Sequence, residues 1–232
     1  MKFGIVTFPG TWSDGDCYYS LGNILEQDVR YIWHKDTDLS GLDCVVLPGG
    51  FSYGDYLRAG AIARFSAVMP AVERFAAGGK LVIGICNGFQ ILCEAGLLPG
   101  ALMTNSHLQY RCQWTNLKVE NHNSPFTNQS TAGQVIKVPI SHHGGNYYAD
   151  ERTLEDLEKN NRVLFRYCES NGEISAGSNP NGSMHNIAGI INARGNVMGM
   201  MPHPERACEP PLGGSDGNII WKSIIRYLTN KA

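Results

Sequence analysis

The sequence predicts an α/β protein in which a mostly parallel, doubly wound sheet carries an antiparallel excursion. Two observations lead to this fold class. In the first half, short apolar runs alternate with segments of helical spacing, as in a parallel sheet that helices cover on both faces. In the second half, short apolar runs follow one another with only turns between them, which favours antiparallel pairing. Because no linker or internal repeat divides the chain, we expect one domain over residues 1–232.

The first half is expected to contain four strands and three helices. The middle helix is inferred from apolar side chains that recur at helical spacing between Leu57 and Phe75. Gly96 lies just beyond the last of these helices, where a capping glycine is common. The expected strands cover residues 3–8, 29–33, 44–47 and 81–85, and the expected helices cover residues 16–26, 57–77 and 87–94.

The second half is expected to contain five short strands and a closing amphipathic helix. Residues 192–196 read Asn-Ala-Arg-Gly-Asn, which indicates a hairpin turn between the last two strands. The closing helix has an aliphatic face, and Ser215 or Asp216 is its expected N-cap. The strands are expected at residues 117–120, 135–140, 163–167, 187–191 and 197–201, and the aliphatic face consists of Ile219, Ile220, Ile224, Ile225 and Leu228.

The charge balance argues against two classes of partner. The chain has 19 Lys and Arg against 21 Asp and Glu, a formal net charge of −2, whereas nucleic acids and anionic membranes attract a basic surface. No apolar run approaches the ~20 residues of a membrane span. The apolar stretch at residues 3–8 is also too short for the core of a signal peptide. We therefore expect a cytoplasmic protein that binds neither nucleic acid nor membrane.

The cysteines and histidines do not form a metal motif. The seven cysteines are scattered and include no Cys-x-x-Cys pair, which favours reduced thiols in the cytosol. His142 and His143 are adjacent, but Asp150 is their only potential co-ligand nearby in the sequence. A polar loop is therefore the better interpretation, and we expect no metal site.

Residues 84–88 read Gly-Ile-Cys-Asn-Gly between an expected strand and an expected helix. This is the Gly-x-nucleophile-x-Gly elbow with cysteine in place of serine. The sharp turn brings neighbouring backbone close, so the residues that flank Cys86 in this motif must be small. The turn also places the thiol at a helix N-terminus, where the helix dipole favours the thiolate. Taken alone, a buried structural cysteine remains the alternative.

A thiolate nucleophile needs an imidazole, and the imidazole needs a group that orients it. Of the seven histidines, His203 is the best candidate because it follows a short apolar strand and precedes Glu205 by two residues. The prolines on either side of His203 are expected to hold the segment extended, so that both side chains point to the same side. Glu205 would then orient one ring nitrogen while the other faces Cys86. Taken alone, a His-x-Glu pair is a weak signal. The alternative is a surface turn in which the two side chains are close only incidentally.

Acyl transfer also requires hydrogen-bond donors for the oxyanion. The elbow supplies the backbone N–H of Asn87, which follows the nucleophile. The second donor is expected from Gly50, in the Pro-Gly-Gly segment that ends the strand at residues 44–47. Glycines there let the backbone approach a substrate without interference from a Cβ atom. A plain strand-to-helix turn is the alternative for this segment.

Together, these three segments resemble the class I, or triad, glutamine amidotransferases. Members of that family share a Gly-x-Cys-x-Gly-x-Gln elbow, an upstream Pro-Gly-Gly and a downstream His-x-Glu. These motifs stand here at residues 84–90, 48–50 and 203–205. Longer segments are similar to the glutaminase subunits of phosphoribosylformylglycinamidine synthases, and the similarity covers essentially the whole chain. Those segments are residues 8–10, 48–64, 84–92 and 200–206.

The resemblance implies the flavodoxin-like fold of that family and a subunit that hydrolyses glutamine for purine synthesis. Cys86 would attack the amide carbon, His203 would move the proton, Glu205 would complete the triad, and a thioester would form and be hydrolysed. Gly50 and Asn87 would stabilise the oxyanions through their N–H groups. Gln90, one helical turn after the nucleophile, would contact the bound glutamine.

The resemblance also implies partners. Ammonia would pass to a synthetase subunit that uses ATP to convert formylglycinamide ribonucleotide to formylglycinamidine ribonucleotide, and a small third subunit would complete the complex. ATP and magnesium are expected on the synthetase, since no ATP motif is visible in this chain. We expect this chain itself to bind no cofactor.

Other functions remain open at this point. A class I glutaminase that serves another synthetase would be expected to lack the block at residues 51–64. A hydrolase or chaperone with a cysteine elbow on a related fold would usually lack the downstream His-Pro-Glu. A catalytically inactive binding subunit would have lost a member of the triad, whereas all three are present here.

Overall fold

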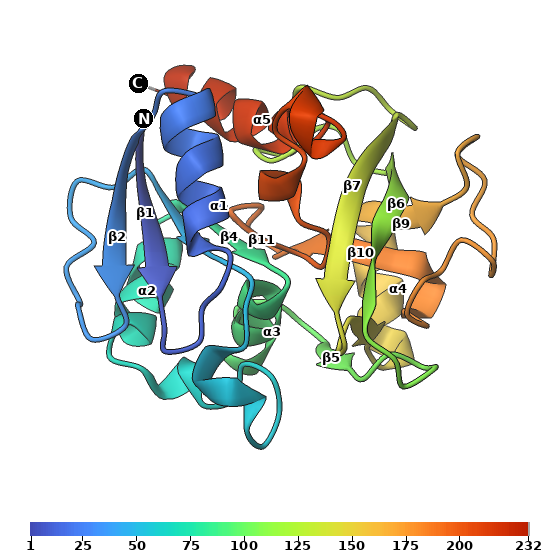
Figure 1. The fold of residues 1–232 in the computed structure, drawn as a ribbon, viewed down its shortest axis with the longest axis horizontal. Coiled ribbons are helices and arrows are strands. Elements are labelled where there is room, and N and C mark those ends of the chain that lie inside the picture. Colours follow the sequence, from blue (N-terminus) through green and yellow to red (C-terminus); the bar gives the residue numbers. More distant parts are fainter. Residues whose placement is uncertain (232) are drawn as a thin grey trace.

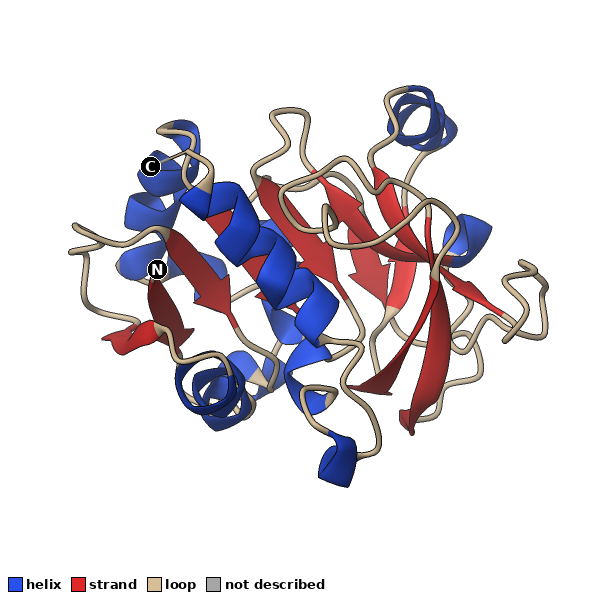
Figure 2. Cartoon of the chain, turned by 90° about the horizontal axis from the view of Figure 1, so that it is seen from above, coloured by secondary structure: helices blue, strands red, loops and turns tan. Residues whose placement is uncertain are grey.

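A computed structural model describes residues 1–231. Its main feature is a sheet of nine strands with helices on both sides (Figures 1 and 2). In spatial order the strands are β2 (Asp28–Trp33), β1 (Lys2–Thr7), β3 (Cys44–Leu47), β4 (Leu81–Ile85), β11 (Val197–Met200), β10 (Ile187–Ile191), β9 (Val163–Cys168), β6 (Arg111–Val119) and β7 (Val135–His142). A second sheet pairs β5 (Ala101–Met103) with β8 (Asn146–Tyr148).

The first five strands of this order are all parallel to their neighbours. Their order along the chain, with the second strand outermost and the first beside it, is that of the flavodoxin-like doubly wound sheet. The four remaining strands continue the same sheet with antiparallel pairing, so that only β10 and β6 run against the other strands. Most strands therefore point one way, which confirms the predicted sheet and its antiparallel excursion.

The helices are α1 (Asp14–Tyr18), which continues as a π-helical turn to Ile24, α2 (Val68–Ala77), α3 (Asn87–Glu94), α4 (Glu151–Lys159) and α5 (Asn218–Thr229). Helices α1 and α2 connect strands of the parallel part, whereas α3 follows β4, α4 precedes β9 and α5 closes the chain. α1 packs against β1, whereas α2 and α3 pack against β4. Within residues 1–231, no helix is long and apolar enough to cross a membrane.

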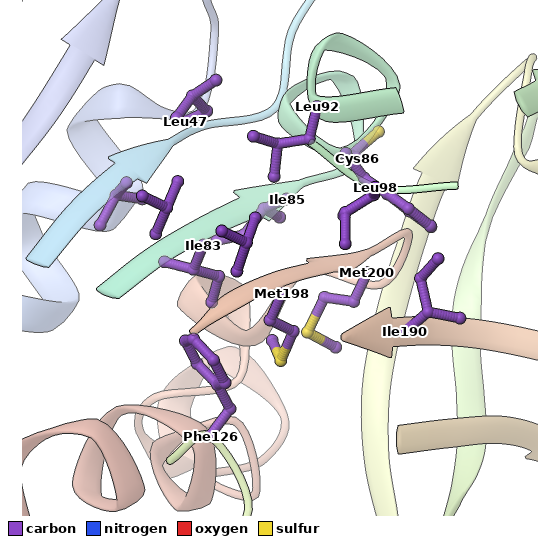
Figure 3. Packing of buried hydrophobic residues seen from close by; sticks show 14 of the residues in the cluster. Leu47, Ile83, Ile85, Cys86, Leu92, Leu98, Phe126, Ile190, Met198 and Met200 are labelled. Atoms are coloured by element: carbon purple, nitrogen blue, oxygen red, sulfur yellow. The ribbon is translucent and has the colours of Figure 1, made fainter. Parts of the chain in front are cut away.

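The core lies at the centre of the sheet, where strands are buried on both faces. Every residue of β3, β4 and β11 is buried. Figure 3 shows Ile83 and Ile85 of β4 beside Met198 and Met200 of β11, with Cys86 at the end of the strand. The buried strands therefore present the nucleophile from a rigid edge.

Two expectations about helices were wrong. The helix expected over residues 57–77 begins only at Val68, because Leu57 and Gly60 have φ angles of 69° and 81°, which no right-handed helix accommodates. Neither Ser215 nor Asp216 caps the last helix with its side chain; the N-cap is Gly217, and the Asp216 carboxylate accepts a hydrogen bond from the Lys137 N–H instead.

Other boundaries also differ. The strand expected at residues 117–120 is part of the longer β6, and the sequence analysis missed α4, β5 and β8. The hairpin at residues 192–196 is confirmed, since Ile191 pairs with Met198 across it. Gly96 follows α3 with a φ of 69°, as expected for a capping glycine.

Candidate active site

Cys86 occupies a strained turn between β4 and α3. Its φ and ψ are 51° and −105°, a conformation that residues with a side chain rarely adopt. The glycines around it are sterically required. A Cβ atom on Gly84 would lie 2.5 Å from Leu92 Cδ1, and one on Gly88 would overlap the carbonyl oxygen of Leu47. The turn thus has the geometry of a nucleophile elbow.

His203 and Glu205 form a buried pair. Nδ1 of His203 lies 2.6 Å from Oε1 of Glu205, and both side chains are almost completely buried. The backbone conformation that produces this contact differs from the expected one. The segment Pro204–Arg206 is one turn of 3-10 helix and not an extended strand, because proline is also compatible with the first turn of a helix. The turn brings Glu205 back toward the imidazole ring.

Sheet pairing brings Cys86 and His203 together. β4 and β11 are neighbours with Ile85 opposite Met200, and the Cys86 N–H donates to the Met200 carbonyl at 2.8 Å. Both side chains also converge on Gly49. A Cβ atom there would lie 2.7 Å from Cε1 of His203 and 3.4 Å from Cβ of Cys86. The predicted triad residues therefore occupy one site.

Charge controls the proton on His203. Burial alone would lower the pKa of this imidazole, but the neighbouring Glu205 carboxylate and Cys86 outweigh burial and raise the pKa to about 10. Nε2 of His203 is buried and has no hydrogen-bond partner among residues 1–231. The ring is thus oriented through Nδ1 and keeps Nε2 available for proton transfer.

Two backbone donors lie beside the nucleophile. The N–H groups of Gly50 and Asn87 donate to no acceptor within residues 1–231; Gly50 lines the same pocket as Cys86, and Asn87 follows Cys86 directly. Gly50 has a φ of 151°, and a Cβ atom on it would collide with Trp12 N and Gly10 O. Unpaired backbone N–H groups at a nucleophile are the arrangement that an oxyanion requires.

Cys86 lines a pocket of about 320 Å³. Gln90 lies in its wall, but its side-chain amide is already engaged. Its Nε2 donates to the Gly144 carbonyl at 2.6 Å, and its Oε1 accepts from Asn87 at 2.9 Å. Gln90 therefore holds two parts of the wall together and faces the space that a substrate would fill.

Two titratable residues of the pocket were not predicted to line it, namely Asp55 and His142. Burial raises the pKa of Asp55 to about 6, although a hydrogen bond from Asn87 opposes the shift. Burial and the nearby His203 lower the pKa of His142 to about 3, so this ring is neutral at pH 7. His142 is held between Asn105 and Asn181. The sequence had favoured a polar loop for His142 and His143, and no local pattern indicated that both residues line the pocket.

Exposed apolar side chains lie at and near the pocket. Phe51, Leu57 and Met103 line the pocket and are exposed. Two further exposed aromatic residues are near in the chain path: Trp12 follows Thr11, which forms a β-bridge with Gly50, and Tyr56 precedes Leu57. We call these five side chains the apolar rim, namely Trp12, Phe51, Tyr56, Leu57 and Met103. Large exposed apolar surface of this kind typically marks a binding site.

Comparison with known proteins gives the same picture as the geometry. A family model described as a CobB/CobQ-like glutamine amidotransferase domain matches residues 1–212. The phosphoribosylformylglycinamidine synthase subunit PurQ of Moorella thermoacetica is 63% identical over 98% of this chain and 96% of that protein. The PurQ subunit of Salinibacter ruber is 54% identical over 98% of this chain and 97% of that protein.

Among solved structures, a chain of PurLQS from Thermotoga maritima superposes with a TM-score of 0.87. It is 41% identical, and the match covers 98% of each chain. At these identities and coverages the similarity extends well beyond the fold. The chain therefore belongs to the glutamine amidotransferase family and, within it, to the PurQ subunits of phosphoribosylformylglycinamidine synthase.

Proposed function

We propose that this chain hydrolyses glutamine to glutamate through a thioester on Cys86 and delivers the ammonia to a synthetase subunit. The observation that carries the proposal is the convergence of Cys86, His203 and Glu205 beside two unpaired backbone N–H groups. Nucleophile, oriented base and oxyanion donors are the parts that acyl transfer needs.

In the first half of the reaction, the Cys86 thiol gives its proton to Nε2 of His203 and its sulfur attacks the side-chain amide carbon of glutamine. The negative oxygen that forms accepts hydrogen bonds from the N–H groups of Gly50 and Asn87. When the C–N bond breaks, His203 returns the proton to the leaving nitrogen, and ammonia and a thioester result. Glu205 holds the imidazole and stabilises its charged form during this step.

In the second half, water attacks the thioester carbon while His203 accepts a proton from that water. The same two N–H groups stabilise the second oxyanion. The C–S bond then breaks, glutamate leaves, and the proton on His203 returns to the sulfur of Cys86. One glutamine and one water thus give one glutamate and one ammonia.

The pocket wall supports an amino-acid substrate. Gln90 faces the space next to Cys86, and we assign it a contact with bound glutamine. Asp55 adds a carboxylate to the same wall, which suits a ligand that carries an ammonium group. The neutral His142 completes the wall without adding charge.

The synthetase partner follows from the PurQ family, whose members are named as subunits of phosphoribosylformylglycinamidine synthase. We propose that this partner binds ATP and magnesium and uses the ammonia to convert formylglycinamide ribonucleotide to formylglycinamidine ribonucleotide in purine biosynthesis. We also propose that a small third subunit completes the complex, as the resemblance to this family implies. All seven cysteines are free, which is consistent with a cytoplasmic location.

The test is an assay of glutamate release from glutamine. Glutamate release is measured for the chain alone and then for the chain mixed with a PurL-type synthetase, ATP, magnesium and formylglycinamide ribonucleotide. We expect glutamate release in the full mixture, with one formylglycinamidine ribonucleotide formed per glutamate. Glutamate release without the ribonucleotide product would indicate another synthetase, and no glutamate release in either mixture would overturn the proposal.

A further inference from the structure

The loop at residues 50–55 has a backbone conformation of high energy, which contacts with neighbouring residues must stabilise. It follows β3 and carries the Gly50 N–H next to Cys86. Tyr53, Gly54 and Asp55 have φ angles of 55°, 72° and 54°, so three successive residues are left-handed and two of them are not glycine. Such conformations persist only where surrounding contacts enforce them.

One anchor holds the inner side of this loop. The N–H and hydroxyl of Ser52 both donate to Oδ1 of Asn87, at 3.1 Å and 2.5 Å, and both residues are buried. Asn87 provides the second oxyanion donor through its own N–H. The contact therefore ties the loop that carries Gly50 to the residue that carries the other donor.

A second anchor holds the outer side. The Tyr53 hydroxyl lies 2.7 Å from Nδ1 of His34 and 2.8 Å from Oγ of Ser66. Both partners are buried, and the Tyr53 ring meets the His34 ring edge-on with centroids 5.6 Å apart. The Tyr53 N–H also donates to the Pro9 carbonyl at 2.7 Å. This cluster lies outside the pocket and touches none of the triad residues, so the mechanism does not use it directly.

We propose that Tyr53 is a positioning residue for the oxyanion hole, through the hydrogen bonds of its hydroxyl to His34 and Ser66. Without them the left-handed turn relaxes, and the Gly50 N–H moves away from the developing oxyanion. The inference rests on the proposed glutaminase function. Because the oxyanion is absent from the bound substrate and develops only as the sulfur attacks, the loss is expected in kcat and not in KM.

The test compares Tyr53→Phe with Tyr147→Phe, assayed as full-length protein in complex with the synthetase. Tyr147→Phe is a matched control, since it deletes one buried hydroxyl that donates to the Pro99 carbonyl at 3.0 Å elsewhere in the fold. Removing one oxyanion donor outright costs about 10²–10³ in kcat. We expect Tyr53→Phe, which displaces a donor, to lower kcat about ten-fold with KM within about two-fold of wild type. Tyr147→Phe should keep the wild-type kcat.

A second measurement isolates the oxyanion hole. The γ-semialdehyde of glutamate should form a hemithioacetal with Cys86, and its oxygen occupies the oxyanion position. Iodoacetamide alkylates the same thiol without an oxyanion. Tyr53→Phe should weaken aldehyde inhibition about ten-fold and leave the alkylation rate unchanged. If Tyr53→Phe does not fold, Ser66→Ala removes one of the two partners and should give a smaller loss in the same direction.

Several outcomes would overturn the inference. They are a wild-type kcat and aldehyde affinity in the folded Tyr53 or Ser66 variant, an equal loss in Tyr147→Phe, or an effect confined to KM. Each leaves the glutaminase function standing, because wild-type activity is measured in the same experiment. An inactive wild-type complex would instead refute the proposed function, and this inference with it.

Discussion

The pKa of His203 is set by two opposing effects, burial and the neighbouring charges. Burial disfavours the imidazolium, whereas Glu205 and Cys86 favour it and raise the pKa to about 10. A group with a raised pKa keeps its proton below that value and loses it as the pH rises through it. Glu205 thereby stabilises the imidazolium that forms when Nε2 of His203 accepts the Cys86 proton, and that proton is then available for the leaving nitrogen.

Replacing Glu205 tests that balance. In Glu205→Gln the charge that raises the pKa of His203 is gone, but a neutral oxygen can still accept from Nδ1. The alkaline limb of kcat/KM should therefore shift to lower pH, and activity should fall less than in His203→Ala, where loss of acid–base catalysis costs about 10²–10⁴-fold. The measurement is kcat/KM from about pH 6 to about pH 10 for the three proteins. An unchanged profile in Glu205→Gln would reduce the triad to a dyad.

Selectivity among the seven thiols is a second test at this scale. Burial raises the pKa of Cys17, Cys44 and Cys93, which leaves their thiols protonated and poorly nucleophilic. Cys112 is exposed but does not line the pocket, whereas Cys86 does. An electrophilic glutamine analogue, such as its diazoketone, should therefore modify Cys86 alone when it binds in the pocket, as read by peptide mapping. Cys86→Ala should abolish both labelling and glutamate release, whereas the control Cys93→Ala should keep both. A label on any other cysteine would contradict the assignment.

At the scale of elements, the elbow depends on how closely α3 approaches β3. A Cβ atom on Gly88 would overlap the Leu47 carbonyl, and buried backbone cannot move aside cheaply. We expect Gly88→Ala to destabilise the fold by at least about 3 kcal/mol, the upper end of ordinary overpacking. For a chain of this size the melting temperature should fall by about 6 °C or more.

Gly15→Ala is the matched control. Gly15 lies in α1 with no atom within 4 Å of its would-be Cβ and no positive φ. An alanine there should stabilise the helix by about 0.5–1 kcal/mol, because glycine loses more backbone entropy on folding. Thermal unfolding of both variants by circular dichroism measures the difference. Equal melting temperatures would contradict this account of the elbow.

The same elements show what sequence can and cannot predict. The buried strands and the elbow were predictable because each rests on a local pattern, an apolar run or glycines at set spacing around Cys86. The helix expected over residues 57–77 failed because apolar periodicity continues through Leu57, whose side chain points to solvent from a left-handed turn. Leu57 is an exposed apolar residue and not a core residue. The periodicity of apolar residues cannot distinguish these two cases.

The sequence predicted which residues form the triad, but it did not predict the backbone conformation that brings them together. His203 and Glu205 were paired on the argument of an extended strand, whereas a 3-10 turn makes the contact. Asp55 was not singled out, and His142 was interpreted as part of a polar loop, because the burial of both depends on segments distant in sequence, such as Asn181 opposite His142. Tertiary packing of this kind leaves no local signature.

For the molecule as a whole, the site's main feature is its position at an open edge bordered by the apolar rim. Ammonia released into bulk water at neutral pH becomes ammonium, which is not a nucleophile. Productive transfer therefore needs a partner that covers the pocket mouth before release. The rim is the natural surface for that partner, since aromatic side chains are the residue type that contributes most at interfaces.

The last prediction tests that surface. Truncating an aromatic anchor at the centre of an interface typically costs 2 kcal/mol or more, about thirty-fold in Kd. We expect Trp12→Ala and Tyr56→Ala to weaken binding of the synthetase by about that factor in isothermal titration calorimetry. Ile174→Ala is the control, because Ile174 is also exposed but lies on the loop after β9, away from the rim. Saturating synthetase should restore glutamine-dependent product formation in the rim variants, since their defect is one of association. An unchanged Kd in both rim variants, or an equal loss in Ile174→Ala, would move the interface to another face of the chain.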